Sequence, residues 1–90
     1  MLFELSEHAF GEVGLAMEWY DNCSPGLGKR FYNAIFKSNA GIIQFPFMHQ
    51  IVFDDIRQIK VNGFPYMLYY KVVKNTIIVL RCVHNKQKHN

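Results

Sequence analysis

The chain has 90 residues, a formal net charge of +3 and a hydrophobic share of 50%. This length predicts one domain with a single core, and the content of 8 Phe, 5 Tyr and 1 Trp argues against intrinsic disorder. Two cysteines without CxxC spacing argue against a disulfide framework, and no apolar run reaches the ~18 residues of a membrane span. Because the N-terminus shows no signal-peptide pattern, we expect a cytoplasmic protein whose cysteines stay reduced.

A short strand and two helices are the first elements predicted. Met1–Leu5 is apolar apart from one Glu and predicts a strand, and Ser6 is a candidate N-cap for a helix directly after it. Apolar residues at three- and four-residue steps then predict an amphipathic helix that ends near Asn22. The turn Ser24-Pro25-Gly26, with Ser24 as the candidate cap, separates it from a second helix at Leu27–Ala40. So short a turn predicts an antiparallel helical hairpin.

The second half predicts three strands. Residues 48–55 are expected to form a loop, with a short extended piece at Gln50–Phe53. From Ile56 onward the pattern becomes strand-like, with a two-residue hairpin signal at Asn62-Gly63 and a second turn at Lys74-Asn75. The nearly all-apolar stretch Thr76–Val83 is expected to be a central strand buried on both faces.

These elements give the order β-α-α-β-β-β. The predicted fold class is therefore α+β, with a helical hairpin packed on one face of a largely antiparallel twisted sheet. No repeat or linker divides the chain, so residues 1–90 are expected to form one domain.

The charges are distributed unevenly along the chain. Residues 1–21 carry five acidic side chains and no Lys or Arg, whereas the part from Ile56 onward carries seven basic side chains and no acidic one. This asymmetry is typical of a protein with one surface for a polyanion, although it also fits two ordinary solvated surfaces.

Basic residues of the predicted strands and of the C-terminal segment form the candidate site. They are Arg57, Lys60, Lys71, Arg81, His84, Lys86 and Lys88. Such an array suits a phosphate backbone. Arg81 interrupts an apolar strand and so needs a bonded partner or a functional site, while His84 can titrate near neutral pH and permits acid–base chemistry. The alternatives are an Arg bonded to helix C-terminal carbonyls or to a carboxylate, and a His that caps the sheet.

Other chemistry has little support in the sequence. The His and Cys residues show no metal-ligand spacing, and Gly26–Gly28 is a helix-start turn rather than a phosphate-binding loop. No cofactor is therefore expected. On the first helix, Trp19 and Tyr20 are expected to be core residues, with contact to a partner as the alternative.

Several blocks of sequence stand out together. They are WYDNCSPGLGKRFYNAI at Trp19–Ile35, Pro46, Ile56-Arg57, FPYMLYY at Phe64–Tyr70 and VLRCVHNKQK at Val79–Lys88. In this order and spacing they resemble the RelE/ParE toxin superfamily, the small toxins of type II toxin–antitoxin modules that are often described as plasmid stabilisation proteins. The resemblance covers nearly the whole chain and implies the same β-α-α-β-β-β fold.

The resemblance implies one of two activities. ParE-like members bind and poison DNA gyrase and are not enzymes, whereas RelE-like members are metal-independent endoribonucleases that cleave mRNA on the ribosome. In a RelE-like protein Arg57, Arg81 and His84 would be catalytic. In either case the substrate- or target-binding residues would be Lys60, Lys71, Lys86 and Lys88.

Two departures from the family pattern favour a ParE-like toxin. No Tyr comes after His84, and Asn85-Lys86-Gln87-Lys88 stands where the family usually has Arg, which grips phosphate in a bidentate manner. An inactive relative that acts only as a binding module is the remaining possibility.

The resemblance also implies a partner. Both branches are neutralised by an antitoxin, encoded by an adjacent gene, whose flexible segment folds onto the toxin. The candidate antitoxin contacts are Trp19, Tyr20 and Phe31. We expect an apolar groove on the helical hairpin and sheet that takes a disordered acidic or amphipathic segment.

Overall fold

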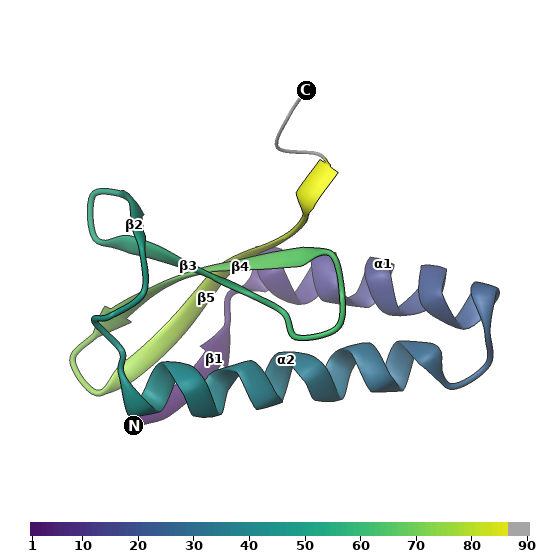
Figure 1. Cartoon of the computed structure of the whole chain (residues 1–90), viewed down its shortest axis with the longest axis horizontal. Coiled ribbons are helices and arrows are strands. Elements are labelled where there is room, and N and C mark those ends of the chain that lie inside the picture. The colour runs from purple at the N-terminus through teal and green to yellow at the C-terminus, as the bar shows by residue number, and fades with distance from the viewer. Residues whose placement is uncertain (87–90) are drawn as a thin grey trace.

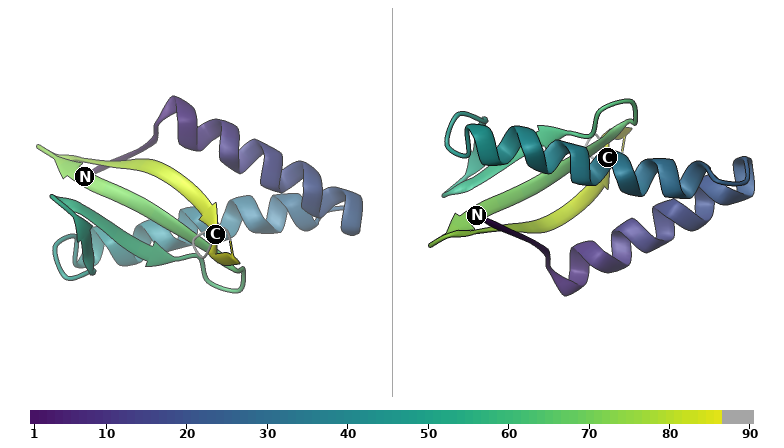
Figure 2. Two further views of the ribbon diagram at one scale, coloured as in Figure 1. Left: turned by 90° about the horizontal axis from the view of Figure 1, so that it is seen from above. Right: turned by 90° about the horizontal axis from the view of Figure 1, so that it is seen from below.

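The structure is a computed structural model that describes residues 1–86, and it consists of two layers (Figure 1). The elements in chain order are β1 (Leu2–Leu5), α1 (Glu7–Cys23), α2 (Leu27–Gln44), β2 (Ile51–Phe53), β3 (Ile56–Lys60), β4 (Tyr66–Val73) and β5 (Thr76–His84). The strands form one sheet in the order β1-β5-β4-β3-β2, in which β1 runs parallel to β5 and the other pairs are antiparallel. Figure 2 shows α2 crossing one face of the sheet with α1 beside it. The predicted α+β class is confirmed.

The helical hairpin begins as predicted but is capped differently at its turn. Ser6 is the N-cap of α1, and its Oγ accepts a hydrogen bond of 3.1 Å from the backbone N–H of Ala9. The N-cap of α2 is Gly26, at a left-handed φ of 87°, and the Asp21 carboxylate accepts a hydrogen bond of 2.8 Å from the N–H of Gly28. The prediction that Ser24 caps α2 is therefore wrong, because Gly26 occupies the N-cap position and the carboxylate of Asp21 in the preceding helix bonds one of the free N–H groups.

The second helix is longer than the pattern indicated. It runs to Gln44 rather than Ala40, because Gly41 does not adopt the left-handed φ that ends many helices and the helix continues until Pro46 restricts the residue before it. After it, β2 forms within the extended piece expected at Gln50–Phe53 and lies at one edge of the sheet.

The turns between the strands match the sequence pattern in part. Lys74 and Asn75 form the predicted tight turn, with Lys74 at a φ of 54°. At Asn62-Gly63 the connection is longer than the two residues predicted, because β3 ends at Lys60 and β4 begins only at Tyr66. Gly63 adopts a φ of 84°, as such a turn requires.

The last strand is interior but not buried on both faces. It lies between β1 and β4, and β4 occupies the middle of the sheet. Ile77 and Val79 are fully buried, whereas Ile78 is only partly buried and Arg81 is exposed. Burial on both faces was therefore a wrong prediction, because no second layer of the described residues covers the face of the sheet opposite the helices (Figure 2).

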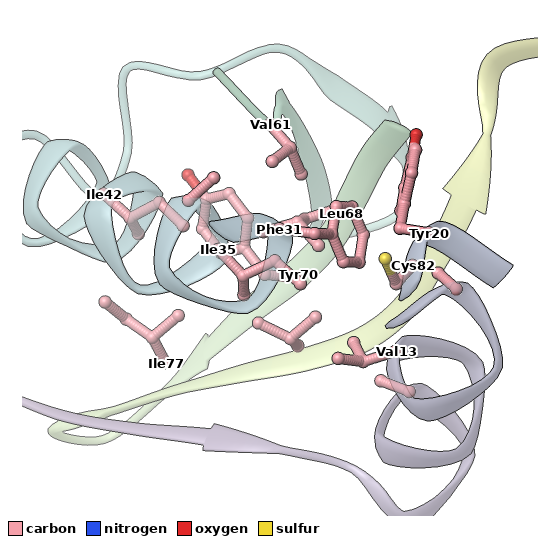
Figure 3. Close-up of a cluster of buried hydrophobic side chains, with 14 residues drawn as sticks. Val13, Tyr20, Phe31, Ile35, Ile42, Val61, Leu68, Tyr70, Ile77 and Cys82 are labelled. Carbon is pink, nitrogen blue, oxygen red and sulfur yellow. The ribbon is translucent and has the colours of Figure 1, made fainter. Parts of the chain in front are cut away.

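One core fills the space between the helices and the sheet (Figure 3). Its largest fully buried side chains are Tyr70, Phe31, Ile35, Ile42, Leu68, Ile77, Val61 and Val79. An aromatic cluster stands at one end, where the Phe31 ring lies 5.3 Å from Tyr20 and 4.9 Å from Tyr66. Trp19, expected in the core, is instead 60% exposed.

None of the helices in the described part combines the length and the apolar composition that crossing a bilayer requires.

The two cysteines differ in their surroundings, which gives a testable difference in reactivity. Cys23 is exposed and Cys82 is buried, and burial raises the pKa of the Cys82 thiol to about 12. A thiol-labelling reagent at pH 8 is expected to modify Cys23 and to spare Cys82 until the protein unfolds. Mass spectrometry of native and urea-unfolded protein measures this. Modification of both thiols in the native protein would contradict the packing around β5.

The same burial gives a pH dependence of stability. The thiol in the unfolded chain ionises from its ordinary pKa of 9.0, while the folded thiol stays neutral up to about 12. The folded state therefore binds more protons in this window, and the contribution of Cys82 to stability falls as the pH rises from 9 toward 12. Urea unfolding of the wild type and of Cys82→Ala at pH 8 and pH 10 tests this. An unchanged difference between the two proteins would contradict it.

Candidate functional site

Arg57 anchors the segment that comes after α2. Its Nη1 donates hydrogen bonds of 2.8 Å to the backbone oxygens of both Phe47 and His49, and its guanidinium lies 5.5 Å from the centre of the Phe47 ring. Beside it, the Tyr70 hydroxyl donates a hydrogen bond of 3.0 Å to the backbone oxygen of Pro46. Arg57 therefore lies on a strand, as predicted, but its guanidinium is bonded to backbone carbonyl groups of the protein itself.

Arg81 is paired with Glu12 of α1. Its Nε lies 3.1 Å from both carboxylate oxygens, and its Nη2 donates a 2.8 Å hydrogen bond to Oε2. These hydrogen bonds to Glu12 raise the pKa of the Arg81 guanidinium above its ordinary value. Of the alternatives that the sequence allowed for Arg81, the bonded carboxylate is the one observed.

Glu12 also closes part of the sheet edge. Strand β1 pairs with β5 only as far as Val79, so β1 does not pair with the later residues of β5. Ser6 donates from its backbone N–H to Val79 O and from its Oγ to Leu80 O, at 2.8 and 3.2 Å. The Glu12 carboxylate then accepts a 2.8 Å hydrogen bond from the N–H of Cys82. The start of α1 thus satisfies backbone groups that an open edge would leave free.

His84 ends β5 and contacts its neighbours. Its Nδ1 accepts a hydrogen bond of 3.1 Å from the N–H of Lys86, and its ring packs edge-on against Tyr66 at 5.1 Å. These contacts match the alternative of a His that caps the end of the sheet. Lys60 and Lys86 are exposed, and Lys71 is partly exposed. Lys88, the remaining predicted basic residue, lies outside the described residues.

The strand register divides these residues between two faces. Arg57 lies opposite Tyr70, which is fully buried on the helix side, and His84 lies opposite Tyr66, which packs against the same core. Side chains alternate between the faces of a strand, so Tyr69 and Lys71 point to the uncovered face. Arg81 lies opposite Tyr69, so it is not on the face of Arg57. The side chains of Arg57 and Arg81 therefore lie on opposite faces of the sheet.

A groove lies between α2 and the turn before β4, and its lining is mixed rather than purely apolar. It has a volume of about 570 Å³ and is lined by Tyr20, Leu27, Arg30, Asn33, Ala34, Lys37, Asn62, Gly63, Phe64 and Pro65. Its two charged lining residues, Arg30 and Lys37, are both basic. An acidic segment with apolar side chains would match this lining.

A second, smaller hollow lies on α1. It has a volume of about 280 Å³ and is lined by Glu12, Leu15, Ala16, Trp19, Tyr66 and Cys82. Leu15 is 72% exposed, and it lies four residues before Trp19 on the same helix face. Leu15 was not among the predicted contact residues, although its i, i+4 spacing to Trp19 outside the core stripe was a usable signal.

The predicted antitoxin contacts therefore separate into two kinds. Trp19 is exposed, whereas Phe31 is fully buried and Tyr20 is 8% exposed. Tyr20 still lines the groove beside α2, but Phe31 offers no surface to a partner. Residues 1–86 contain no group of three His, Cys, Asp or Glu side chains placed to hold a metal ion.

Comparison with known proteins adds one finding. No family model and no curated protein matches the sequence. Among solved structures, a chain of the chromosomal ParDE TA system from P. aeruginosa matches with a TM-score of 0.79 over 93% of this chain and 95% of that chain. This chain therefore has the same fold as that ParDE-system chain. At 14% identity the likeness establishes the fold, as the sequence blocks had implied, while function depends on the site.

Proposed function

We propose that this chain is the toxin of a type II toxin–antitoxin module, of the ParE-like kind. It would arrest growth by binding a target such as DNA gyrase, and a cognate antitoxin encoded by an adjacent gene would neutralise it. The observation that carries this proposal is the RelE/ParE-like fold, matched over nearly the full length of both chains to a chain of a ParDE system.

The bonding of the predicted catalytic residues supports a ParE-like rather than a RelE-like toxin. General acid–base work on an RNA phosphate needs a base, an acid and cations that converge on one reacting group. Here Arg57 is bonded to two backbone carbonyl groups and Arg81 to the Glu12 carboxylate. The two guanidinium groups also belong to opposite faces of the sheet. A toxin that acts by binding does not need them to converge.

The uncovered face of the sheet is the proposed target surface. Lys60 lies opposite Met67, and Met67 and Lys71 share the face of Tyr69. Lys60 and Lys71 are therefore proposed to contact an acidic surface of the target, and Lys86, which lies just after β5, is proposed to extend this contact.

The antitoxin is proposed to occupy the helical side. The groove beside α2 combines apolar lining residues with the basic side chains of Arg30 and Lys37, which suits an acidic, amphipathic segment. Trp19 and Leu15 on α1 provide exposed apolar side chains for the same partner. A disordered antitoxin segment could cover both surfaces, because such segments wrap large areas when they fold on binding.

Two measurements test the toxin proposal. Expression of the chain alone should arrest growth, and co-expression of the neighbouring antitoxin gene should restore it. Purified protein should inhibit gyrase supercoiling or trap its cleavage complex. Growth arrest without any effect on gyrase would exclude gyrase as the target, and absence of growth arrest would favour an inactive relative that only binds a partner.

The RelE-like alternative makes a different prediction. Primer extension on mRNA from translating ribosomes should then show cuts at the ribosomal A site, and Arg81→Ala should abolish them. Arg81 is suited to this test because its side chain is 50% exposed, so its loss is expected to leave the fold intact. No cuts with the wild-type protein would exclude this activity.

A further inference from the structure

The segment Phe45–Phe53, here called the apolar ledge, exposes an unusual amount of apolar surface. Six of its residues are exposed large hydrophobic side chains: Phe45 at 49%, Phe47 at 65%, Met48 at 74%, Ile51 at 51%, Val52 at 41% and Phe53 at 67%. From Gly41 to Phe53 the sequence contains no Asp, Glu, Lys or Arg. None of the surfaces proposed for the antitoxin or the target includes these residues.

The apolar ledge is held in one conformation by side chains of the sheet. Arg57 bonds the carbonyl groups of Phe47 and His49, and the Tyr70 hydroxyl bonds that of Pro46. Gln58 adds two hydrogen bonds to Gln50, one from its backbone N–H at 3.0 Å and one from its side chain at 2.9 Å. A surface ordered in advance loses less conformational entropy when a partner binds. These contacts indicate that the ledge holds its exposed side chains in a fixed arrangement that a partner can bind.

The ledge ends in an edge strand that has room for a partner. Among the strands of residues 1–86, β2 pairs with β3 on one side only (Figure 1). Natural proteins commonly protect such edges with charged residues, Pro, bulges or very short strands. β2, Ile51–Phe53, contains no charged residue and no Pro, although it is short and its register against β3 shifts between Ile51 and Phe53. A polyanion is a poor occupant because the ledge carries no Lys or Arg. An apolar strand edge of the same composition is a suitable occupant.

A second copy of this chain fits the ledge by symmetry. An antiparallel pairing of two β2 strands about Val52 places Ile51 of one copy opposite Phe53 of the other, so that apolar side chains meet in cross-strand pairs. Asp54 and Asp55 lie in the turn after β2, so no charged side chains are opposed within the paired strands. Such a two-fold contact is closed and self-complementary, as in most dimers.

The exposed apolar area of the ledge is also large enough for a dimer interface. With about 200 Å² for a fully exposed side chain of this size, the six residues expose roughly 700 Å² per copy. A standard interface buries about 800 Å² per partner, and a dimer that covers most of the ledge clears the roughly 1,000 Å² in total that a specific interface needs.

We propose that the apolar ledge is a self-association surface, through which two copies of the chain pair edge to edge at β2. In this arrangement Arg57 is a positioning residue that holds the ledge in place. The pairing joins two five-stranded sheets into one continuous sheet. It does not depend on the target or on the antitoxin.

Sedimentation equilibrium over a range of protein concentrations tests the proposal. The wild-type chain should show a concentration-dependent monomer–dimer equilibrium. Phe53→Lys should weaken it about tenfold or more, because it places a charge at the apolar edge. Phe10→Lys is the matched control, since Phe10 on α1 is exposed to the same 67%, and it should leave the equilibrium unchanged. Circular dichroism confirms that both variants are folded.

Cross-linking tests the register. In a Cys23→Ser background, Val52→Cys places two thiols opposite each other across the two-fold axis, within the range that a disulfide requires. Oxidation should give a covalent dimer in high yield, whereas Phe10→Cys in the same background should not. A protein that stays monomeric at all concentrations, or equal effects of Phe53→Lys and Phe10→Lys, would overturn the proposal.

Discussion

Replacing Phe31 with Ala is expected to lower the free energy of unfolding by about 3–5 kcal/mol. Phe31 is fully buried, and its ring contacts Tyr20, Phe64 and Tyr66 at centroid distances of 5.3, 5.1 and 4.9 Å. The cavity left by Ala would separate α2 from the turn before β4 and from α1 at once. Small domains are stable by only about 5–15 kcal/mol, so a loss of this size is a large share of the total. Urea unfolding followed by circular dichroism measures it.

Trp19→Ala is the matched control for this experiment. Trp19 is 60% exposed, so its removal is expected to change the free energy of unfolding by no more than about 0.5 kcal/mol. If the antitoxin contacts α1 as proposed, the same variant should weaken antitoxin binding by about 2 kcal/mol or more in a titration. A Trp19→Ala protein as unstable as Phe31→Ala would contradict the packing of α1. Unchanged antitoxin affinity would remove Trp19 from the antitoxin surface.

The backbone of the fold was largely predictable from local patterns. Ser6 caps α1, the apolar period forms both helices, and Lys74-Asn75 closes the last hairpin, because each of these signals acts over a few residues. The length of the turn at Asn62-Gly63 was not predictable in the same way. It depends on where β3 and β4 end, which is a property of the packed structure.

The division of neighbouring aromatic residues between core and surface was harder to predict. Trp19 and Tyr20 are adjacent, and the sequence pattern placed both in the core, although only Tyr20 is buried. Successive helix residues point about 100° apart, so only one of such a pair can lie at the centre of the buried stripe. The three- and four-residue steps through Ala9, Val13 and Ala16 continue to Tyr20, and they were the signal that should have decided between the two.

The hydrogen-bond partners of the basic residues could not be predicted from local sequence patterns. The need of Arg81 for a partner could be deduced from its place in an apolar strand, but its partner Glu12 lies 69 residues away. Arg57 was recognised as the strand Arg of the family pattern, yet its bonds go to carbonyl groups of the segment after α2. The positions of these carbonyl groups depend on where α2 ends. Long-range contacts of this kind depend on topology, and one sequence without its fold does not reveal them.

Glu12→Ala is expected to lower the free energy of unfolding by about 1–3 kcal/mol, because it leaves the N–H of Cys82 without its partner. Glu12 is only partly exposed, with 21% of its side chain accessible, and it joins the start of α1 to the part of β5 beyond the β1 pairing. Arg81→Ala should cost no more than about 1 kcal/mol, since exposed ion pairs contribute little. Chemical denaturation of both variants and of the double variant gives the coupling between them.

Glu12→Gln separates the two roles of this side chain. An amide oxygen can still accept the hydrogen bond from Cys82 but no longer pairs with the charge of Arg81, so Glu12→Gln should be closer in stability to the wild type than to Glu12→Ala. Equal losses in the two variants would mean that Glu12 contributes through its charge pair with Arg81 and not through its hydrogen bond to Cys82.

Because Arg81→Ala is expected to remain folded, its growth phenotype reports on the role of the guanidinium itself. Retained growth arrest would fit a toxin that acts by binding, and loss of arrest together with loss of mRNA cuts would fit a ribonuclease.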